Sequence, residues 1–320
     1  MPSKVPLSSW MAHVANPNVL VSHLSIPGTH DSCSKSVVPF VGTQSLTVSE
    51  QAEQGIRFFD LRVNLTAKKN PVLVHGDYPL GLGLVDVLQS LYDFLDNHPK
   101  EGLVIQFKRD GSLPAKWTPF DFSNVIFSVI ASNPSRWRLE TDIPKLSDLQ
   151  GRIQLVRRFE LFPPQPLNSA GLDVQDWKDN WDIPFPIAAT PGSPVPNVRV
   201  QDKYDFAYAR GGPWKTIPIK FDLVKSLMQE AASNQKPDVW YFNYSSAVTF
   251  TLAEPWEFAQ GFYDDDRSKY CKGVNTYMQE FLTAQVQPLA RYGVLMMDYP
   301  TDSRSTNLVR AIIESNDLIP

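Results

Sequence analysis

Short apolar runs alternate with amphipathic segments along most of the chain. Runs rich in β-branched and aromatic residues, bounded by glycine, proline or charged residues, predict strands. Apolar residues spaced i, i+3, i+4 and i+7 predict helices between them, as in residues 84–95, where five aliphatic residues share one face. The expected strands are 19–26, 56–65, 72–75, 103–108, 153–158, 198–204, 239–244 and 293–298, and the expected helices are 84–95, 121–131, 221–232, 274–289 and 306–314.

This repetition of strand and helix predicts an α/β protein with a parallel sheet, open or closed into a (β/α) barrel. Charged residues and histidines stand at or near the ends of different predicted strands. Such scatter favours a barrel, whose site draws on many strands, over a doubly wound sheet with one crevice. A dinucleotide fingerprint is absent, because Gly81-Leu82-Gly83 lacks the third glycine.

Composition narrows the functional classes. The 320 residues suffice for one large domain or two modest ones, and the net charge of −4 gives no basic field for nucleic acid. Cys33 and Cys271 have no metal-ligand spacing, and a single bridge between them stays open. No window approaches 18 consecutive apolar residues, and residues 1–15 lack the pattern of a signal peptide. We therefore expect a cytoplasmic or mature secreted protein without a membrane span.

Two histidines are the most informative residues. His30 follows an apolar run and a Pro-Gly pair, and Asp31 comes directly after it. His75 ends the apolar run 71–74 and precedes Gly76. One histidine after a strand is more often structural, but two in such settings favour acid–base chemistry, because imidazole titrates near neutral pH. The other three histidines lack such settings, and we expect structural or surface roles for them.

Charged residues at other strand ends allow two interpretations each. Asp60 and Arg62 face the same side of a strand, either as an internal ion pair or with Arg62 clamping a phosphate. Asp298 follows an apolar strand and either caps a turn or fixes the tautomer of a histidine. The run Lys108-Arg109-Asp110 is typical of solvated surface.

Several motifs together resemble the catalytic X domain of phosphatidylinositol-specific phospholipase C, in its bacterial, metal-independent form. They occur in that family's order from about residue 24 to residue 299. The motifs are LSIPGTHDS, RFFDLRV, LVHG, LVIQFKRD, RIQLVRRF, VQDKY and GVLMMDY. The resemblance implies a distorted TIM-like (β/α) barrel, and we expect residues 1–320 to form a single catalytic domain.

The resemblance also implies a two-histidine mechanism. His30, supported by Asp298, would take the proton of the inositol 2-hydroxyl, which attacks the neighbouring phosphorus. His75, supported by Asp31, would protonate the departing diacylglycerol oxygen. Arg62 would neutralise a phosphate oxygen as charge develops on it. The expected catalytic residues are His30, His75, Arg62, Asp31, Asp298 and Asp60.

The same residues indicate chemistry without a metal or other cofactor. The calcium-dependent relatives carry Asn after the first histidine, a Glu-Leu-Asp strand and a Glu at the end of a later strand. This chain has Asp31, Asp60-Leu61-Arg62 and Lys108 at those places. Because calcium needs several oxygen ligands, Arg62 and Lys108 would repel it.

The family's inositol-binding positions correspond here to Lys108, Arg158, Asp202 and Tyr204. The expected partner is a phosphatidylinositol-containing membrane surface, contacted transiently by a monomer. The loop 177–196, in the proline-rich segment 162–196, has no counterpart in the resemblance. Its aromatic residues either dip into a bilayer interface or pack on the barrel.

Two other functional classes remain open. One is a non-catalytic phosphoinositide-binding barrel, which would not need both histidines. The other is a metal-dependent, glycerophosphodiesterase-like enzyme, against which Arg62 and Lys108 argue.

Overall fold

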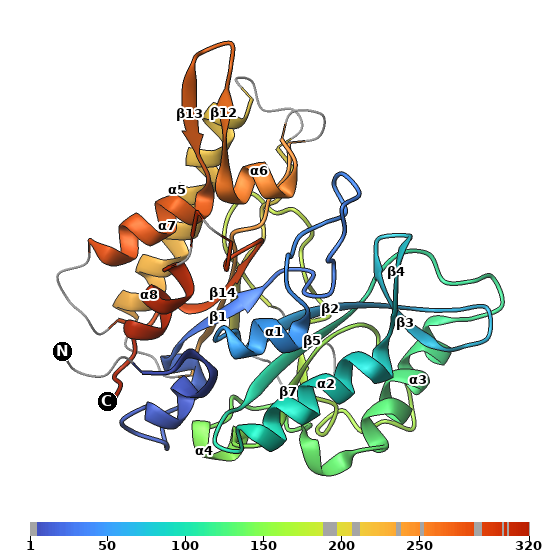
Figure 1. Cartoon of the computed structure of the whole chain (residues 1–320). Coiled ribbons are helices and arrows are strands. Elements are labelled where there is room, and N and C mark those ends of the chain that lie inside the picture. Colours follow the sequence, from blue (N-terminus) through green and yellow to red (C-terminus); the bar gives the residue numbers. More distant parts are fainter. Residues whose placement is uncertain are drawn as a thin grey trace.

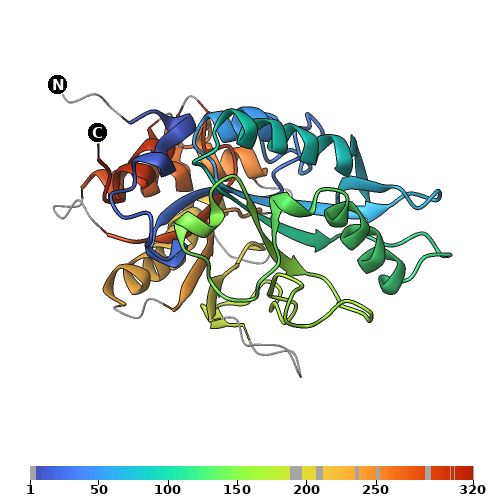
Figure 2. The ribbon, with the colours of Figure 1, turned by 90° about the horizontal axis from the view of Figure 1, so that it is seen from below.

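A strongly curled sheet forms the centre of the molecule in the computed structural model (Figures 1 and 2). The structure describes residues 5–187, 197–206, 212–234, 238–249, 253–284, 290–302, 304–305 and 307–319. Seven strands run parallel, in the spatial order β7-β5-β2-β1-β14-β11-β10. They are β1 (Ser25–Thr29), β2 (Phe58–Leu65), β5 (Leu103–Arg109), β7 (Ile153–Arg158), β10 (Val198–Gln201), β11 (Trp240–Tyr244) and β14 (Gly293–Met297).

The barrel is open on one side. Two short strands, β6 (Trp137–Arg138) and β8 (Leu172–Asp173), pair parallel to β7 at one edge. The short strand β9 (Phe185–Pro186) pairs antiparallel to β10 at the other edge. Within the described part of the chain, no ladder joins these two edges. The expected barrel is therefore a curled, incompletely closed sheet.

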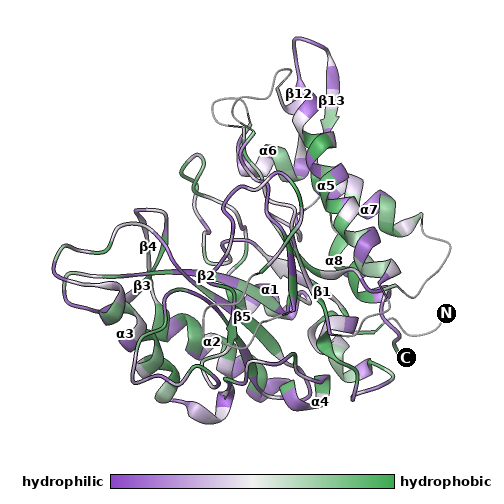
Figure 3. Ribbon diagram, turned by 180° about the vertical axis from the view of Figure 1, so that it is seen from behind, coloured by the Kyte–Doolittle hydropathy of each residue, from purple (hydrophilic) through white to green (hydrophobic). Residues whose placement is uncertain are grey.

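Helices surround the outside of the sheet (Figure 2). In α2 (Leu84–Asn97) the predicted face is buried, including Leu88, Leu91 and Leu95. Burying each such side chain contributes about 1.5–3 kcal/mol. Figure 3 shows hydrophobic stretches in the central strands and frequent hydrophilic residues in the loops. The other α-helices are α1 (Val48–Glu53), α3 (Pro119–Ala131), α4 (Leu146–Leu149), α5 (Pro213–Ser233), α6 (Pro255–Gln260), α7 (Val274–Thr283) and α8 (Leu308–Glu314), with short 3-10 turns at Leu7–His13, Val21–His23 and Pro134–Arg136.

The first strand differs from the expected 19–26. Residues Val21–His23 form a 3-10 turn, and β1 contains the Pro27-Gly28 pair that the pattern treats as a break. Neighbouring strands on both sides supply the pairing, so the tertiary context overrides the local preference. A Cβ atom on Gly28 would lie 2.9 Å from Cβ of Phe58, so glycine permits the close approach of β1 and β2.

The strand that carries His75 is antiparallel, which corrects the expectation of a parallel strand. β3 (Pro71–His75) pairs antiparallel with β2 and with β4 (Tyr78–Gly83). Because β2 runs on past its neighbours, β3 turns back along its extension. His75 therefore returns to the same end of the sheet as His30.

The C-terminal part contains elements that the sequence pattern missed. α5 begins at Pro213, eight residues before the expected 221, and α7 ends at Thr283; the expected residues 285–289 and 306 lie outside the described part. The hairpin of β12 (Gly261–Asp264) and β13 (Lys269–Lys272) projects beyond α6 (Figure 1). Among the described residues, no helix is both long and apolar enough to cross a bilayer.

Candidate active site

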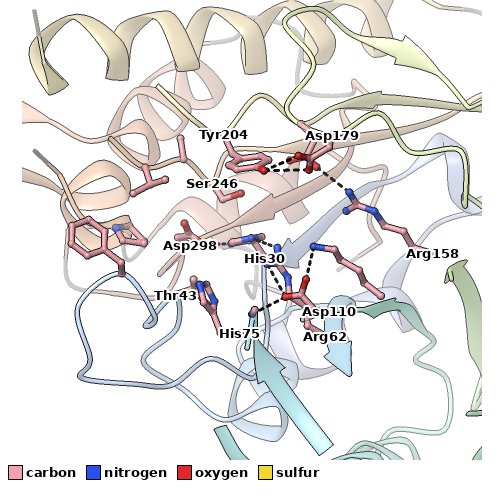
Figure 4. A pocket seen from close by; sticks show the side chains of 17 residues that line it. His30, Thr43, Arg62, His75, Asp110, Arg158, Asp179, Tyr204, Ser246 and Asp298 are labelled. Atoms are coloured by element: carbon pink, nitrogen blue, oxygen red, sulfur yellow. Dashed lines mark hydrogen bonds and ion pairs between the residues drawn. The ribbon is translucent and has the colours of Figure 1, made fainter. Parts of the chain in front are cut away.

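A cavity of about 300 Å³ opens at the carboxyl ends of the parallel strands (Figure 4). Asp31 and Asp60 are fully buried and contact residues of its wall. The lining includes the remaining residues that the sequence predicts for the site: His30, Arg62, His75, Lys108, Arg158, Asp202, Tyr204 and Asp298. The curled sheet thus gathers side chains from the whole length of the chain into one place.

His30 and Asp298 form a hydrogen-bonded pair at the ends of the adjacent strands β1 and β14. The distance from His30 Nδ1 to Asp298 Oδ1 is 2.8 Å, and the Gln44 amide donates to the carbonyls of His30 and Met297. Burial raises the pKa of Asp298 well above its usual range. Burial, followed by the charge of Arg62, lowers the pKa of His30 well below 6.5. His30 is therefore a neutral imidazole at pH 7, as a proton acceptor must be.

His75 and Asp31 form a second pair beside the first. His75 Nδ1 lies 2.5 Å from Asp31 Oδ2. Asp31 is fully buried and has a left-handed φ of 40°, which aspartate tolerates better than most residues. Burial raises the pKa of Asp31, against the opposing effects of Arg62 and His75. The short separation places the buried carboxylate in hydrogen-bond contact with the imidazole ring.

Arg62 contacts one member of each histidine–carboxylate pair, and its contact with His30 can be followed in Figure 4. Its Nη2 contacts His30 Nε2 at 2.5 Å, and its Nε lies 3.5 Å from Asp60 and 3.7 Å from Asp31. Its Nη1 lies 3.5 Å from Asp110. Burial disfavours the charge, but the surrounding carboxylates hold the pKa of Arg62 well above its ordinary value. Within the described residues, no group of three or more His, Cys, Asp or Glu side chains is arranged to hold a metal ion.

Asp110 belongs to this site, although its charge run suggested solvated surface. Its Oδ1 lies 2.9 Å from Lys108 Nζ, and its Oδ2 accepts the backbone N–H of Gly76 at 2.9 Å. Burial raises the pKa of Asp110, but Arg62 and Lys108 outweigh it and leave the pKa low. Asp110 thus connects the end of β5 to the turn that carries His75. Its spacing of two residues from Lys108 is a sequence signal for a shared face.

The side of the cavity opposite Arg62 is built around Asp202. Trp177 Nε1 donates to Asp202 Oδ2 at 2.8 Å, and Arg158 Nη2 lies 3.7 Å from the same oxygen. The Arg158 guanidinium stacks over the Trp177 ring at 4.1 Å. The hydroxyl of Tyr204 donates to the carboxylate of Asp179, with distances of 3.0 and 3.2 Å to its two oxygens. These groups offer charged and polar partners for a polyhydroxylated ligand.

The loop that starts at residue 162 supplies part of this wall. Of the two expectations for its aromatic residues, packing on the barrel is correct for Trp177 and Phe185. Trp177 packs edge-on against Phe185 and Tyr244, and Phe185 is buried. Trp181 remains 48% exposed. Asp179 lines the cavity and was missed, because nothing local distinguishes it from other loop aspartates. Residues 188–196 of the loop lie outside the described part.

Comparison with known proteins shows which proteins this chain resembles. Residues 20–159 match the model of the phosphatidylinositol-specific phospholipase C X domain. The 1-phosphatidylinositol phosphodiesterase of Listeria monocytogenes is 26% identical, with 96% of this chain and 86% of that protein covered. The protein of the same name from Staphylococcus aureus strain Newman is 27% identical, with coverages of 98% and 95%. Over residues 20–159 the chain is thus similar to the phosphatidylinositol-specific phospholipase C X domain, and both relatives match it over nearly its whole length.

A solved structure of the Staphylococcus aureus phosphatidylinositol-specific phospholipase C, from work on its membrane binding, shares this fold. It aligns with a TM-score of 0.79 at 24% identity and covers 98% of both chains. The expected resemblance and the TIM-like barrel fold are thus confirmed. The X domain match runs from before β1 to just after β7, so it includes His30, Arg62, His75 and Lys108. Asp202, Tyr204 and Asp298 come from the later strands.

The two cysteines do not form the bridge that the sequence left open. Cys33 and Cys271 are both free and buried. Burial raises the pKa of the Cys33 thiol well above its ordinary value. Neither cysteine lines the cavity, and the site is built without thiol chemistry.

Proposed function

We propose that this protein is a phosphatidylinositol-specific phospholipase C that cleaves phosphatidylinositol to diacylglycerol and a cyclic inositol phosphate without a metal ion. One observation carries the proposal. Two histidines line one cavity, each with its Nδ1 held by a buried carboxylate, and Arg62 contacts both pairs. Relatives named 1-phosphatidylinositol phosphodiesterase match 96% and 98% of this chain, which supports the same activity.

In the first step of this mechanism, His30 acts as the general base. Its neutral Nε2 accepts the proton of the inositol 2-hydroxyl while that oxygen bonds to phosphorus. The bond from phosphorus to the diacylglycerol oxygen breaks, and His75 donates a proton to that oxygen. Because the attacking hydroxyl belongs to the substrate itself, proximity contributes much of the rate. Asp298 and Asp31 keep the two rings oriented through their Nδ1 atoms.

Arg62 stabilises the charge that develops on the phosphate. In the structure its Nη2 contacts His30 Nε2, the atom that must accept the proton. A bound phosphate attracts the guanidinium away from the ring, which leaves Nε2 free for the hydroxyl. Arg62 also occupies the space among Asp31, Asp60 and Asp110, where a cation would otherwise neutralise the carboxylates. This arrangement supports metal-independent chemistry.

Lys108, Arg158, Asp202 and Tyr204 bind the inositol ring in this proposal, together with Asp179. The cavity mouth faces the membrane. The loop between β1 and α1 supports this orientation, because Val37 in this loop is fully exposed while Phe40 lines the cavity. Since one curled sheet gathers the described lining residues into one site, we also propose that residues 1–320 act as a single-domain monomer.

Phosphatidylinositol vesicles in excess chelator test the proposal. Release of diacylglycerol and a cyclic inositol phosphate, followed by phosphorus NMR, is the expected result for the parent protein. His30→Ala and His75→Ala should each abolish release. His98→Ala is the matched control, because His98 contacts Glu53 away from the cavity. Alanine variants as active as the parent, or activity that returns only with calcium, would refute the mechanism.

A further inference from the structure

Lys220 is a buried lysine behind the cavity wall, and the proposed mechanism does not use it. It lies on α5, which packs against β10 and β11 on the outside of the sheet. The side chain is fully buried. Its Nζ donates to the backbone carbonyl of Lys203 at 2.5 Å and to Oε1 of Gln201 at 3.2 Å. The side chain of Lys220 is therefore hydrogen-bonded to the end of β10 and to the segment that follows it.

The segment bound by Lys220, residues 201–204, contributes Asp202 and Tyr204 to the cavity lining. Gln201 Oε1 also accepts the backbone N–H of Lys203 at 2.9 Å, so the turn is closed on both sides of Asp202. The Gln201 amide donates to Asn243 Oδ1 at 2.9 Å and to the Tyr244 carbonyl at 2.8 Å. These bonds tie the turn to the end of β11.

The network returns to the helix that carries the lysine. Asn243 Nδ2 donates to the carbonyl of Val224 on α5 at 2.8 Å. Lys220 and Val224 are one helical turn apart, so α5, β10 and β11 are joined in a closed ring of hydrogen bonds. This ring of hydrogen bonds restrains the position of the 201–204 turn.

Burial of an ammonium group costs desolvation free energy, whereas a methionine of similar length would pack without that cost. A lysine at this position therefore points to a role for its polar group. The charged groups that face Lys220 are Asp202 and Lys203 after β10 and Asp298 after β14. Burial lowers the pKa of Lys220 to about 7, against the effect of the two aspartates. The Lys220 nitrogen thus lies beside a turn that contributes two cavity residues.

We propose that Lys220 is a positioning residue of the inositol subsite, which holds the 201–204 turn so that Asp202 and Tyr204 meet the substrate ring. The proposal rests on the proposed function, since it assumes that this wall binds inositol. It assigns Lys220 no contact with substrate and no part in proton transfer.

Direct binding of myo-inositol and the kinetics of phosphatidylinositol cleavage test the proposal together. In Lys220→Met, the dissociation constant for myo-inositol, measured by NMR titration, and the KM should both rise about tenfold or more, because hydrogen bonds to a charged group are lost. The kcat should change less than about threefold. Lys220→Arg keeps charge and donors and should restore most of the affinity. Lys215→Met is the matched control, since Lys215 is exposed on the same helix.

The outcomes separate the two proposals. A parent protein that binds myo-inositol without cleaving phosphatidylinositol contradicts the proposed function alone. A folded Lys220→Met variant with the parent's affinity, or one that loses only kcat, overturns the positioning role, as does a parent that does not bind myo-inositol. If Lys220→Met does not give a native circular dichroism spectrum, Lys220→Gln replaces it, because the amide still donates to the Lys203 carbonyl.

Discussion

Replacing Asp31 by asparagine should separate the activity of this protein from its stability. Asparagine has nearly the same shape and tolerates the left-handed φ of 40° at this position. The change therefore removes one negative charge at 2.5 Å from His75 Nδ1 and little else. In the proposed mechanism, His75 must carry a positive charge before it protonates the leaving oxygen, and Asp31 stabilises that charge.

The magnitude follows from the geometry. With Nδ1 and Oδ2 at 2.5 Å, the centres of the two charges lie about 4 Å apart, and at an effective dielectric constant of about 20 they interact by about 4 kcal/mol. Loss of that interaction corresponds to about 10³ in rate. Arg62 also neutralises Asp31, so we expect kcat/KM to fall by about 10²–10³.

The stability of the Asp31→Asn variant should increase or stay the same while its activity falls. Burial raises the pKa of Asp31 in the folded protein, so the folded state binds this proton more tightly than the unfolded state. The contribution of Asp31 to the free energy of unfolding is then present at low pH and is lost as the pH rises through the folded pKa. At neutral pH the ionised side chain lowers stability, and asparagine removes that penalty. The Tm of Asp31→Asn should equal or exceed that of the parent.

The assay combines initial rates on phosphatidylinositol vesicles with thermal denaturation at pH 7. Asp77→Asn is the control, because Asp77 is an exposed carboxylate just beyond the His75 turn whose Oδ1 accepts the backbone N–H of Ser112. It should leave the rate within about twofold of the parent. A rate for Asp31→Asn within threefold of the parent would refute the charge argument, and a large fall in Tm would refute the stability argument.

Three further predictions follow from the same geometry. Arg62→Lys keeps a charge among the carboxylates but loses the planar fork, so kcat should fall at least about 10²-fold while Tm stays within about 3 °C in a thermal melt. Trp177→Phe removes the donor to Asp202 and keeps a ring under Arg158, so KM should rise about three- to tenfold with little change in kcat; an unchanged KM would show that the indole N–H is dispensable. Val37→Asp should weaken vesicle binding in a sedimentation assay and slow cleavage there, yet leave hydrolysis of a water-soluble cyclic inositol phosphate unchanged; equal losses on both substrates would contradict a membrane role.

Arg62 balances the charge of three carboxylates beside the cavity. Asp31, Asp60 and Asp110 converge on Arg62, and all three lie within 3.7 Å of its nitrogens. Removing the guanidinium altogether would leave buried carboxylates without a partner, which costs about 3–5 kcal/mol in comparable cases. The same residue therefore serves the fold and, in the proposed mechanism, the phosphate.

The sequence by itself determined the features that depend on local periodicity and on residue type. The spacing of Leu88, Leu91 and Leu95 defines the buried face of α2, and the alternation in β2 places Asp60 and Arg62 on one side. The motifs around His30 and His75 indicated the family and acid–base chemistry. These inferences succeed because a helix or strand repeats its geometry every few residues, so that a pattern in the chain is also a pattern in space.

Only the tertiary structure decided how distant segments meet. Asp110, Asp179 and Lys220 resemble any surface residue in the sequence, yet two line the cavity and one is buried behind it. β1 forms through a Pro-Gly pair because its neighbours supply the ladder, and β3 turns back antiparallel to bring His75 to the site. Such contacts depend on strand order and on the closure of long loops. They join residues far apart in the chain; His30 and Asp298, for example, are 268 positions apart. No local pattern encodes a distance of that kind, because it is set by the packing of the whole sheet.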